Sequence, residues 1–273
     1  MTFNRLTQNS LVTLLALSLF AACREDVVEA INPAAKNTVT LEFDNRVGSK
    51  PMVLNTATYK NGSGEEFTVT TFNYFVSNVA LTKSDGSVVK FPDEYFLVRQ
   101  ADAKTLTADL PNVPAGDYKN VSFTVGVDSS RSVADVSLRK GVLDVASYGD
   151  DGMYWSWNSG YIFLKLEGTS PVVPVRTDGR KLFQIHVGGF GGMTSKMANN
   201  LRSVSLPLTS PATVRGNVAP EVHLFVDAMT IFDGKAPIKL AQTNSIHNPA
   251  LAAPVADNYA GMFSVDHVHN NKQ

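Results

Sequence analysis

The chain contains 273 residues, carries a formal net charge of −1, and has only 18% charged residues. This balance provides no basic surface for the phosphates of DNA or RNA, so nucleic-acid binding is excluded as a function class. The hydrophobic share of 44% is sufficient for a packed core and argues against a disordered chain.

The N-terminus has the organisation of a bacterial lipoprotein signal. Arg5 precedes an apolar run over residues 11–20, which is too short for a stable membrane anchor, and two alanines lead from this run to Cys23. We therefore expect a signal peptide over residues 1–22, a lipid on Cys23 and a tether over residues 23–37. The alternative is an ordinary signal peptide in which the cysteine is incidental.

The residues after the cysteine favour the outer membrane. Arg24 is not the aspartate that retains some lipoproteins in the inner membrane, and Glu25 and Asp26 resemble the acidic tags of some surface lipoproteins. We expect a domain anchored to the outer membrane through its lipid, in the periplasm or at the cell surface. Because Cys23 is the only cysteine, lipidation would leave no thiolate for a zinc or blue-copper site.

Period-two hydrophobic patterns predict an all-β domain over residues 38–273. Apolar residues alternate with polar ones over residues 39–44, as in a half-buried strand. Further strands are predicted over residues 67–82, 95–99, 119–127, 153–166, 181–187, 202–208 and 221–232. This spacing favours an antiparallel β-sandwich with long loops. Residues 129–140 are expected to form a loop or short helix, and the chain from Asn244 a C-terminal wrap of loop and short helix.

Both tryptophans, Trp155 and Trp157, stand in the run MYWSWNSGYIFLKLEG over residues 153–168. In a strand the two indoles project to the same face, and the ordinary interpretation is a pair that fills the core. The Asn-Ser-Gly step over residues 158–160 interrupts two apolar halves at the point where a core strand would continue. The step therefore indicates a position where polarity or backbone freedom is needed.

All five histidines fall in the last third of the chain, a distribution that favours a metal site. His267 and His269 form a His-x-His pair, which on a strand projects both rings to one side, and Asp266 is placed to orient one of them. The alternative for this pair is a solvent-facing tail.

The other three histidines have ordinary interpretations beside the metal hypothesis. His186 ends a predicted strand at a glycine-rich loop, where functional side chains often lie, but an edge histidine with satisfied hydrogen bonds explains it equally well. His247 precedes Asn-Pro, so a turn or capping role is the default. His223 stands between apolar neighbours and is interpreted as a half-buried core histidine.

The tryptophan run resembles the fingerprint of the MbnP-like family, periplasmic copper-binding proteins first named from methanobactin operons. Three shorter stretches resemble the same family, over residues 72–79, 183–188 and 262–269. The resemblance implies a β-rich domain that binds copper, as Cu(I) or Cu(II).

This resemblance also assigns roles to particular residues. It makes His186, His267 and His269 the first candidate metal ligands, with His247 behind them. In some members a tryptophan is oxidised to kynurenine, which makes Trp155 and Trp157 the candidate positions here. The modifying partner it implies is a di-haem, cytochrome-c-peroxidase-like (MbnH-like) protein.

Three functions compete at this stage. The first is a copper-binding lipoprotein of the cell envelope, acting in copper acquisition or handling. The second is a glycan-binding or adhesive β-sandwich that stacks Trp155 and Trp157 on sugar rings, which leaves the His-x-His pair unexplained. A hydrolase ranks last, because neither a nucleophile elbow nor paired carboxylates stand out, and we expect the chain not to be an enzyme.

Overall fold

The computed structural model describes residues 31–155, 160–192 and 195–273. The expected signal peptide, the lipid acceptor Cys23 and most of the tether lie outside the described residues, as does Trp157. Among the residues described, no helix combines the length and the apolar character needed to cross a bilayer.

Five strands form one sheet, called sheet 1, in the order β14-β12-β1-β2 with β6 paired to β1. They are β1 (Lys36–Val47), β2 (Lys50–Pro51), β6 (Thr107–Pro114), β12 (Val218–Asp227) and β14 (Phe263–Lys272). β1 and β12 run parallel, and the other pairs in this sheet are antiparallel.

Nine strands form the second sheet, sheet 2, in the order β11-β7-β4-β9-β10-β13, with β3 and β5 paired to β4 and β8 paired to β9. They are β3 (Tyr59–Lys60), β4 (Glu66–Lys83), β5 (Val88–Arg99), β7 (Gly116–Val125), β8 (Tyr154–Trp155), β9 (Gly160–Thr169), β10 (Leu182–Gly188), β11 (Arg202–Val214) and β13 (Ser245–Ile246). The short strand β13 runs parallel to β10, and the other pairs are antiparallel.

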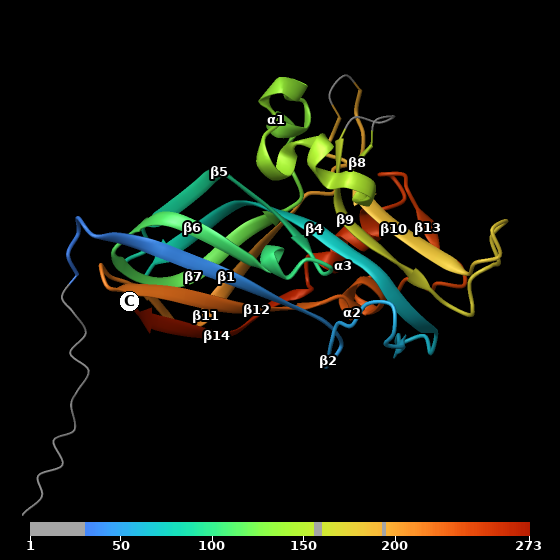
Figure 1. Cartoon of the computed structure of the whole chain (residues 1–273), viewed down its shortest axis with the longest axis horizontal. Coiled ribbons are helices and arrows are strands. Elements are labelled where there is room, and N and C mark those ends of the chain that lie inside the picture. Colours follow the sequence, from blue (N-terminus) through green and yellow to red (C-terminus); the bar gives the residue numbers. More distant parts are fainter. Residues whose placement is uncertain (1–30, 156–159, 193–194) are drawn as a thin grey trace, which may run out of the picture. The chain divides into compact units, whose positions relative to one another are not determined.

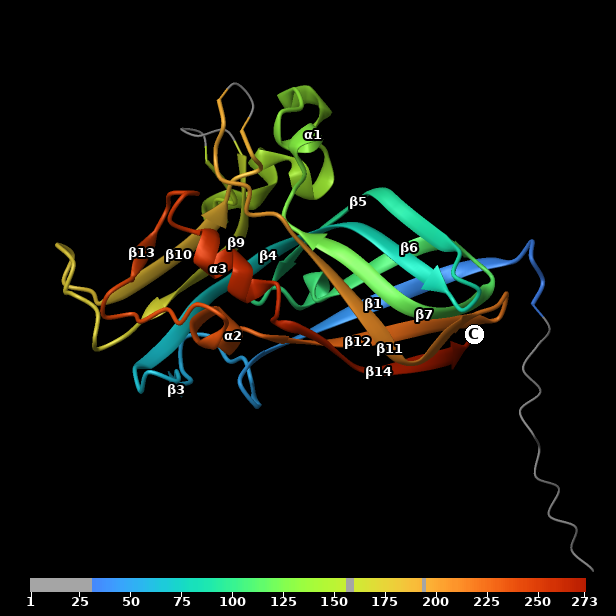
Figure 2. The same cartoon turned by 180° about the vertical axis from the view of Figure 1, so that it is seen from behind.

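Short helices connect these strands. They are η1 (Ala103–Thr105), α1 (Ser129–Ser132), η2 (Val136–Leu138), η3 (Gly141–Leu143), η4 (Val145–Asp151), α2 (Met229–Asp233) and α3 (Ala253–Tyr259). The loop or short helix expected over residues 129–140 is therefore confirmed as α1 and η2. Figure 1 places α1 and β8 on the opposite side of this unit from β12 and β14, and Figure 2 shows the same for α1.

The main core lies between the two sheets. Buried and half-buried residues alternate along β1 and β12, so one face of sheet 1 is buried, and its buried side chains are apolar apart from Asn45. Aromatic rings from the two sheets meet there: Phe43 packs edge-on against Tyr74 at 6.0 Å between ring centroids, and Phe263 against Phe123 at 4.9 Å. The predicted all-β sandwich is confirmed, with two parallel strand pairs as the exception to its antiparallel pairing.

Trp155 belongs to a second, smaller apolar cluster and not to the core between the sheets. The predicted single strand over residues 153–166 is wrong, because Trp155 of β8 pairs antiparallel with Gly160 of β9 and the chain reverses direction between them. Trp155 is 6% exposed and shares this cluster with Met153, Phe75, Tyr161 and others. The cluster includes residues of η3 and η4, so the helical segment covers the indole.

The C-terminal segment differs from its prediction in one respect. The expected loops and short helix occur between residues 244 and 262, as β13 and α3. The chain then returns as the ten-residue strand β14, which pairs with β12 along most of its length. The solvent-facing tail considered for His267 and His269 is therefore wrong. Both residues stand on an edge strand of sheet 1.

Candidate metal centre

The five histidines gather in two groups, one on each sheet. His186 and His247 form a pair on sheet 2, with 4.4 Å between their ring centroids. His223, His267 and His269 form a trio on sheet 1, and their ligand atoms lie within 4.8 Å of one another. The sequence placed His267 and His269 on one face correctly. It did not predict that His223 joins them or that His247 contacts His186, although His247 does precede a turn as expected.

The pair arises from the parallel pairing of β10 with β13. Gln184 and Ile185 are in register with Ser245 and Ile246, so the next residues on the two strands are His186 and His247. Their rings meet at 81°, edge to face. Hydrophobic periodicity does not predict this contact, because β13 has only two residues.

A carboxylate fixes the ring of His186. Nε2 of His186 lies 2.6 Å from Oε1 of Glu167 on β9, and His186 is 8% exposed. Burial raises the pKa of Glu167, but the hydrogen bond from His186 and the charge of Lys165 outweigh burial and lower the pKa to about 2. The ionised carboxylate accepts a hydrogen bond from Nε2–H of His186. In this tautomer the neutral ring keeps its lone pair on Nδ1.

His247 is held in its neutral form. Burial is the main cause that lowers the pKa of His247. A neutral imidazole carries a lone pair at physiological pH and is therefore competent as a metal ligand.

Trp155 lies at the same end of β10 as this pair. Its indole packs against Gly188, where an added Cβ would stand 2.6 Å from Cζ3 of Trp155. The side-chain amide of Asn200 donates to the carbonyl oxygens of Gly188 and Pro249, at 2.6 and 2.8 Å, and ties the end of β10 to the turn after His247. The tryptophan run and the histidine pair, distant in sequence, therefore converge at one end of β10.

The trio stands on the face of sheet 1 that points away from the core. In the row Val222-His223-Leu224 the two apolar neighbours are fully buried, and the alternation places His223 on the opposite face with its side chain 22% exposed. His223 is half-buried as predicted, but its ring lies on the outer face of the sheet and not on the core side. Asp266 does contact an imidazole, as expected, with 2.8 Å between Oδ2 and Nδ1 of His267.

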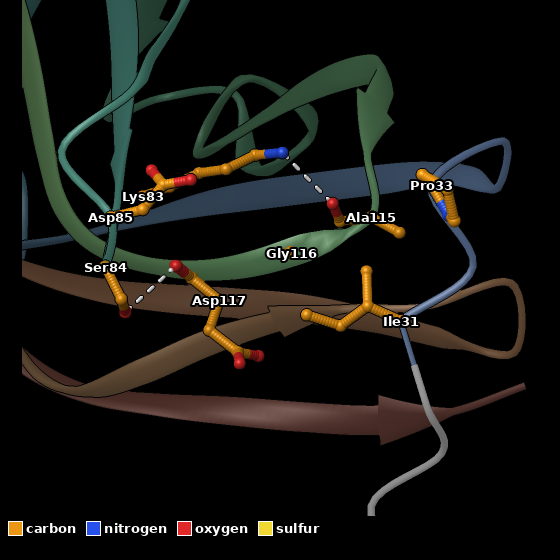
Figure 3. A pocket seen from close by; sticks show the side chains of 8 residues that line it. All are labelled: Ile31, Pro33, Lys83, Ser84, Asp85, Ala115, Gly116 and Asp117. Carbon is orange, nitrogen blue, oxygen red and sulfur yellow. Dashed lines mark hydrogen bonds between the residues drawn. The ribbon is translucent and has the colours of Figure 1, made fainter.

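The hollow in Figure 3 has a different chemistry. It is lined by Ile31, Pro33, Lys83, Ser84, Asp85, Ala115, Gly116 and Asp117. Nζ of Lys83 donates to the carbonyl oxygen of Ala115 at 3.1 Å, and the carboxylate of Asp117 pairs with Arg215 at 2.9 Å. With its charged groups paired in this way and no imidazole in its lining, this hollow provides no histidine ligand set.

Comparisons with known proteins agree with the resemblance noted in the sequence. The sequence model of the MbnP family matches residues 36–248. Among solved structures, MbnP from Methylosinus trichosporium is similar over 85% of this chain and 99% of that chain, with a TM-score of 0.55 and 15% sequence identity. No curated protein sequence matches the chain. The family match includes His186, His223 and His247 and ends before His267 and His269.

Proposed function

The chain belongs to the MbnP family, and from this premise we propose that it is a copper-binding protein of the bacterial cell envelope, acting in copper acquisition or handling. The ion is held between His186 and His247, beside Trp155. The observation that carries the proposal is the convergence of these three residues at one end of β10, inside the part of the chain that the family model matches.

The donor set of the pair fits copper. Imidazole is a good ligand for copper, and both neutral rings offer a lone pair: His186 on Nδ1, because its Nε2–H donates to Glu167, and His247 because burial lowers its pKa. The two rings are in contact, with 4.4 Å between their centroids, and in the proposal one ion binds a nitrogen of each ring. The carboxylate of Glu167 orients a ligand in this arrangement, a common partner of metal-bound histidine.

Trp155 is the better candidate of the two tryptophans for oxidation to kynurenine, because its indole packs beside the end of β10 that carries the pair. Conversion of an indole to kynurenine cleaves the C2–C3 bond and adds two oxygen atoms; hydrolysis then removes C2 as formate. In formal balance two peroxide molecules, reduced to water, supply the oxygens, and the di-haem partner would carry the electrons. The product adds an aniline nitrogen and a ketone next to the histidines. Peptide mass mapping of protein from its native host tests this step: kynurenine at Trp157 alone would refute the choice of Trp155, and two unmodified tryptophans would remove kynurenine from the proposal.

The cell-envelope location rests on the N-terminal signal and on the family. The proposal places the domain on the outer membrane, anchored by a lipid on Cys23. Radiolabelled palmitate incorporated into the wild type but not into Cys23→Ala would support it. Incorporation into neither would indicate an ordinary signal peptide.

The burial of Trp155 argues against the glycan-binding alternative, which needs an exposed indole at this position. An indole that is 6% exposed offers no face to a sugar ring. The expectation that the chain is not an enzyme stays a prediction.

Copper affinity in matched variants tests the proposal. We expect His247→Gln and His186→Gln to weaken Cu(I) binding, measured by competition with a colorimetric chelator, by at least about tenfold each, because each removes one of two protein ligands. His269→Gln is the matched control, since it removes a histidine from the other sheet and should leave Cu(I) affinity unchanged. Equal affinities in all three variants and the wild type would refute the proposed site.

A further inference from the structure

The outer face of sheet 1 carries an ordered row of side chains across three strands. Glu42 of β1 is directly opposite His223 of β12, and His223 is directly opposite His267 of β14. In the next row Glu221 is opposite His269. Side chains opposite one another on the same face lie about 5 Å apart at Cβ, so the register itself gathers three imidazoles and two carboxylates.

A β-bulge at Asp266 makes this gathering possible. His223 pairs with His267, but the next residue of β12, Leu224, pairs with Val265, so Asp266 is the extra residue on β14. Val265 packs on the core, and strict alternation from it would turn His267 toward the core as well. The bulge shifts the alternation by one residue and turns both His267 and His269 to the outer face.

A carboxylate contacts the Nδ1 atom of two of the three rings. Nδ1 of His223 lies 3.0 Å from Oε2 of Glu42, and Nδ1 of His267 lies 2.8 Å from Oδ2 of Asp266. Each Nδ1 therefore carries the proton, which leaves the lone pair of the neutral ring on Nε2. This is the arrangement in which a carboxylate orients a metal-bound histidine.

The Nε2 atoms face one another. Nε2 of His267 lies 2.9 Å from Nε2 of His269. Nε2 of His223 is buried and, among the described residues, has no hydrogen-bond partner; the nearest carboxylate oxygen in an ion-pair contact is Oε2 of Glu221 at 3.8 Å. A buried acceptor left without a donor costs stability, and a cation bound to it removes that cost.

We propose that His223, His267 and His269, with the carboxylate of Glu221 beside them, form a second metal site that takes a divalent ion of the Zn²⁺ or Cu²⁺ class. Three imidazoles and a carboxylate are the donors that such ions accept, and no thioether or thiolate favours Cu(I) among the four side chains. Bonds of about 2.0–2.1 Å in a tetrahedral set separate neighbouring nitrogens by about 3.3 Å. The ligand atoms of the three histidines lie within 4.8 Å of one another, with 2.9 Å between Nε2 of His267 and Nε2 of His269, so they span this spacing.

This site is separate from the proposed copper site and does not depend on it. It stands on sheet 1, whereas His186 and His247 stand on sheet 2, and two of its ligands lie beyond the part of the chain that the family model matches. Its ligands come from both strands of the β12–β14 pair. A bound ion would therefore fasten the C-terminal strand to its neighbour and raise the unfolding temperature of the whole domain.

Titration of the folded domain with Co²⁺, a spectroscopic substitute for Zn²⁺, tests the proposal. In the wild type we expect the visible absorption bands of tetrahedral Co²⁺, which Zn²⁺ then abolishes by displacement. His267→Gln should lose the bands. Glu42→Gln, which keeps all ligands but replaces the charged acceptor of the His223 Nδ1–H by a neutral amide oxygen, should weaken Zn²⁺ affinity about 10–100-fold.

His247→Gln is the matched control, because it damages the proposed copper site and leaves the trio intact. Bands that are absent from the wild type, that persist in His267→Gln, or that disappear in His247→Gln would each overturn the second site. If His267→Gln does not fold, Glu42→Gln decides the matter: its substituted side chain is partly exposed on the outer face, and an unchanged Zn²⁺ affinity in it would overturn the proposal. None of these outcomes alters the Cu(I) test of His186 and His247.

Discussion

Substitution of Glu65 by glutamine should destabilise the domain at a point that also supports His247. The carboxylate of Glu65 is buried and accepts three hydrogen bonds, from the side chain of Asn61 at 2.8 Å and from the backbone amides of Leu240 and Ala241 at 2.7 and 3.0 Å. Glutamine has one acceptor oxygen, so at least one of these donors must face an NH₂ group. Loss of a charged acceptor, with an N–H left unpaired, costs about 1.5–3 kcal/mol of unfolding free energy.

Urea unfolding followed by far-UV circular dichroism measures this difference, and Glu66→Gln is the matched control. Glu66 is exposed and pairs only with the exposed Lys60 at 3.3 Å, so its substitution should change the unfolding free energy by at most about 1 kcal/mol. Equal effects of the two substitutions would refute the reasoning. The segment at Leu240 leads into β13 and His247, so Cu(I) affinity should fall in Glu65→Gln and not in Glu66→Gln.

The difference in unfolding free energy between the wild type and Glu65→Gln should also depend on pH. Burial raises the pKa of Glu65, but the hydrogen bonds from Asn61, Ala241 and Leu240 outweigh burial and lower the pKa below its usual value of 4.5. A carboxyl group with a lowered pKa in the folded state contributes stability above its unfolded pKa and loses that contribution as the pH falls through the folded value. The difference between wild type and Glu65→Gln should be constant near neutral pH and shrink below about pH 4.5. A difference that grows toward acid pH would contradict this sign.

Two further substitutions test the packing around Trp155. Gly188→Ala puts a Cβ 2.6 Å from Cζ3 of Trp155 and 2.7 Å from the carbonyl oxygen of Tyr161. Because the backbone cannot move aside as a side chain does, we expect the unfolding free energy measured in urea to fall by about 1–3 kcal/mol. Cu(I) binding should weaken as well. A variant as stable as the wild type would show that the contact is not tight. Asn200→Ala leaves the carbonyl oxygens of Gly188 and Pro249 without their donor. It should cost about 1–3 kcal/mol and weaken Cu(I) binding, whereas an unchanged copper affinity would disconnect this bridge from the site.

Local pattern predicted the sandwich because burial on one face imposes a period of two on the strands. The alternation over residues 39–44 identifies part of β1, and the predicted strand over residues 67–82 is β4 within one residue at each end. The same rule failed at Trp155, where a period-two run conceals a reversal into a hairpin with β9. It also missed β14, because the bulge at Asp266 breaks the alternation that identifies a strand.

The sequence predicted which histidines share a face of one strand, but not which histidines meet through pairing between strands. His267 and His269 share a face because they are two residues apart, which the sequence states directly. Their partner His223 depends on the register between β12 and β14, and the contact of His186 with His247 depends on a two-residue parallel strand. One signal could have identified His223: its buried neighbours on both sides place its ring on the opposite face of the strand.

The copper content of the protein purified from its native host tests the central claim most directly. Elemental analysis of the wild type after dialysis against a weak chelator should find about one copper per chain more than in His247→Gln, expressed and purified in the same way, whatever the divalent-ion site on sheet 1 holds in both. The control His269→Gln should keep its copper. Wild-type protein without copper, or His247→Gln with the wild-type amount, would contradict a copper site at His186 and His247.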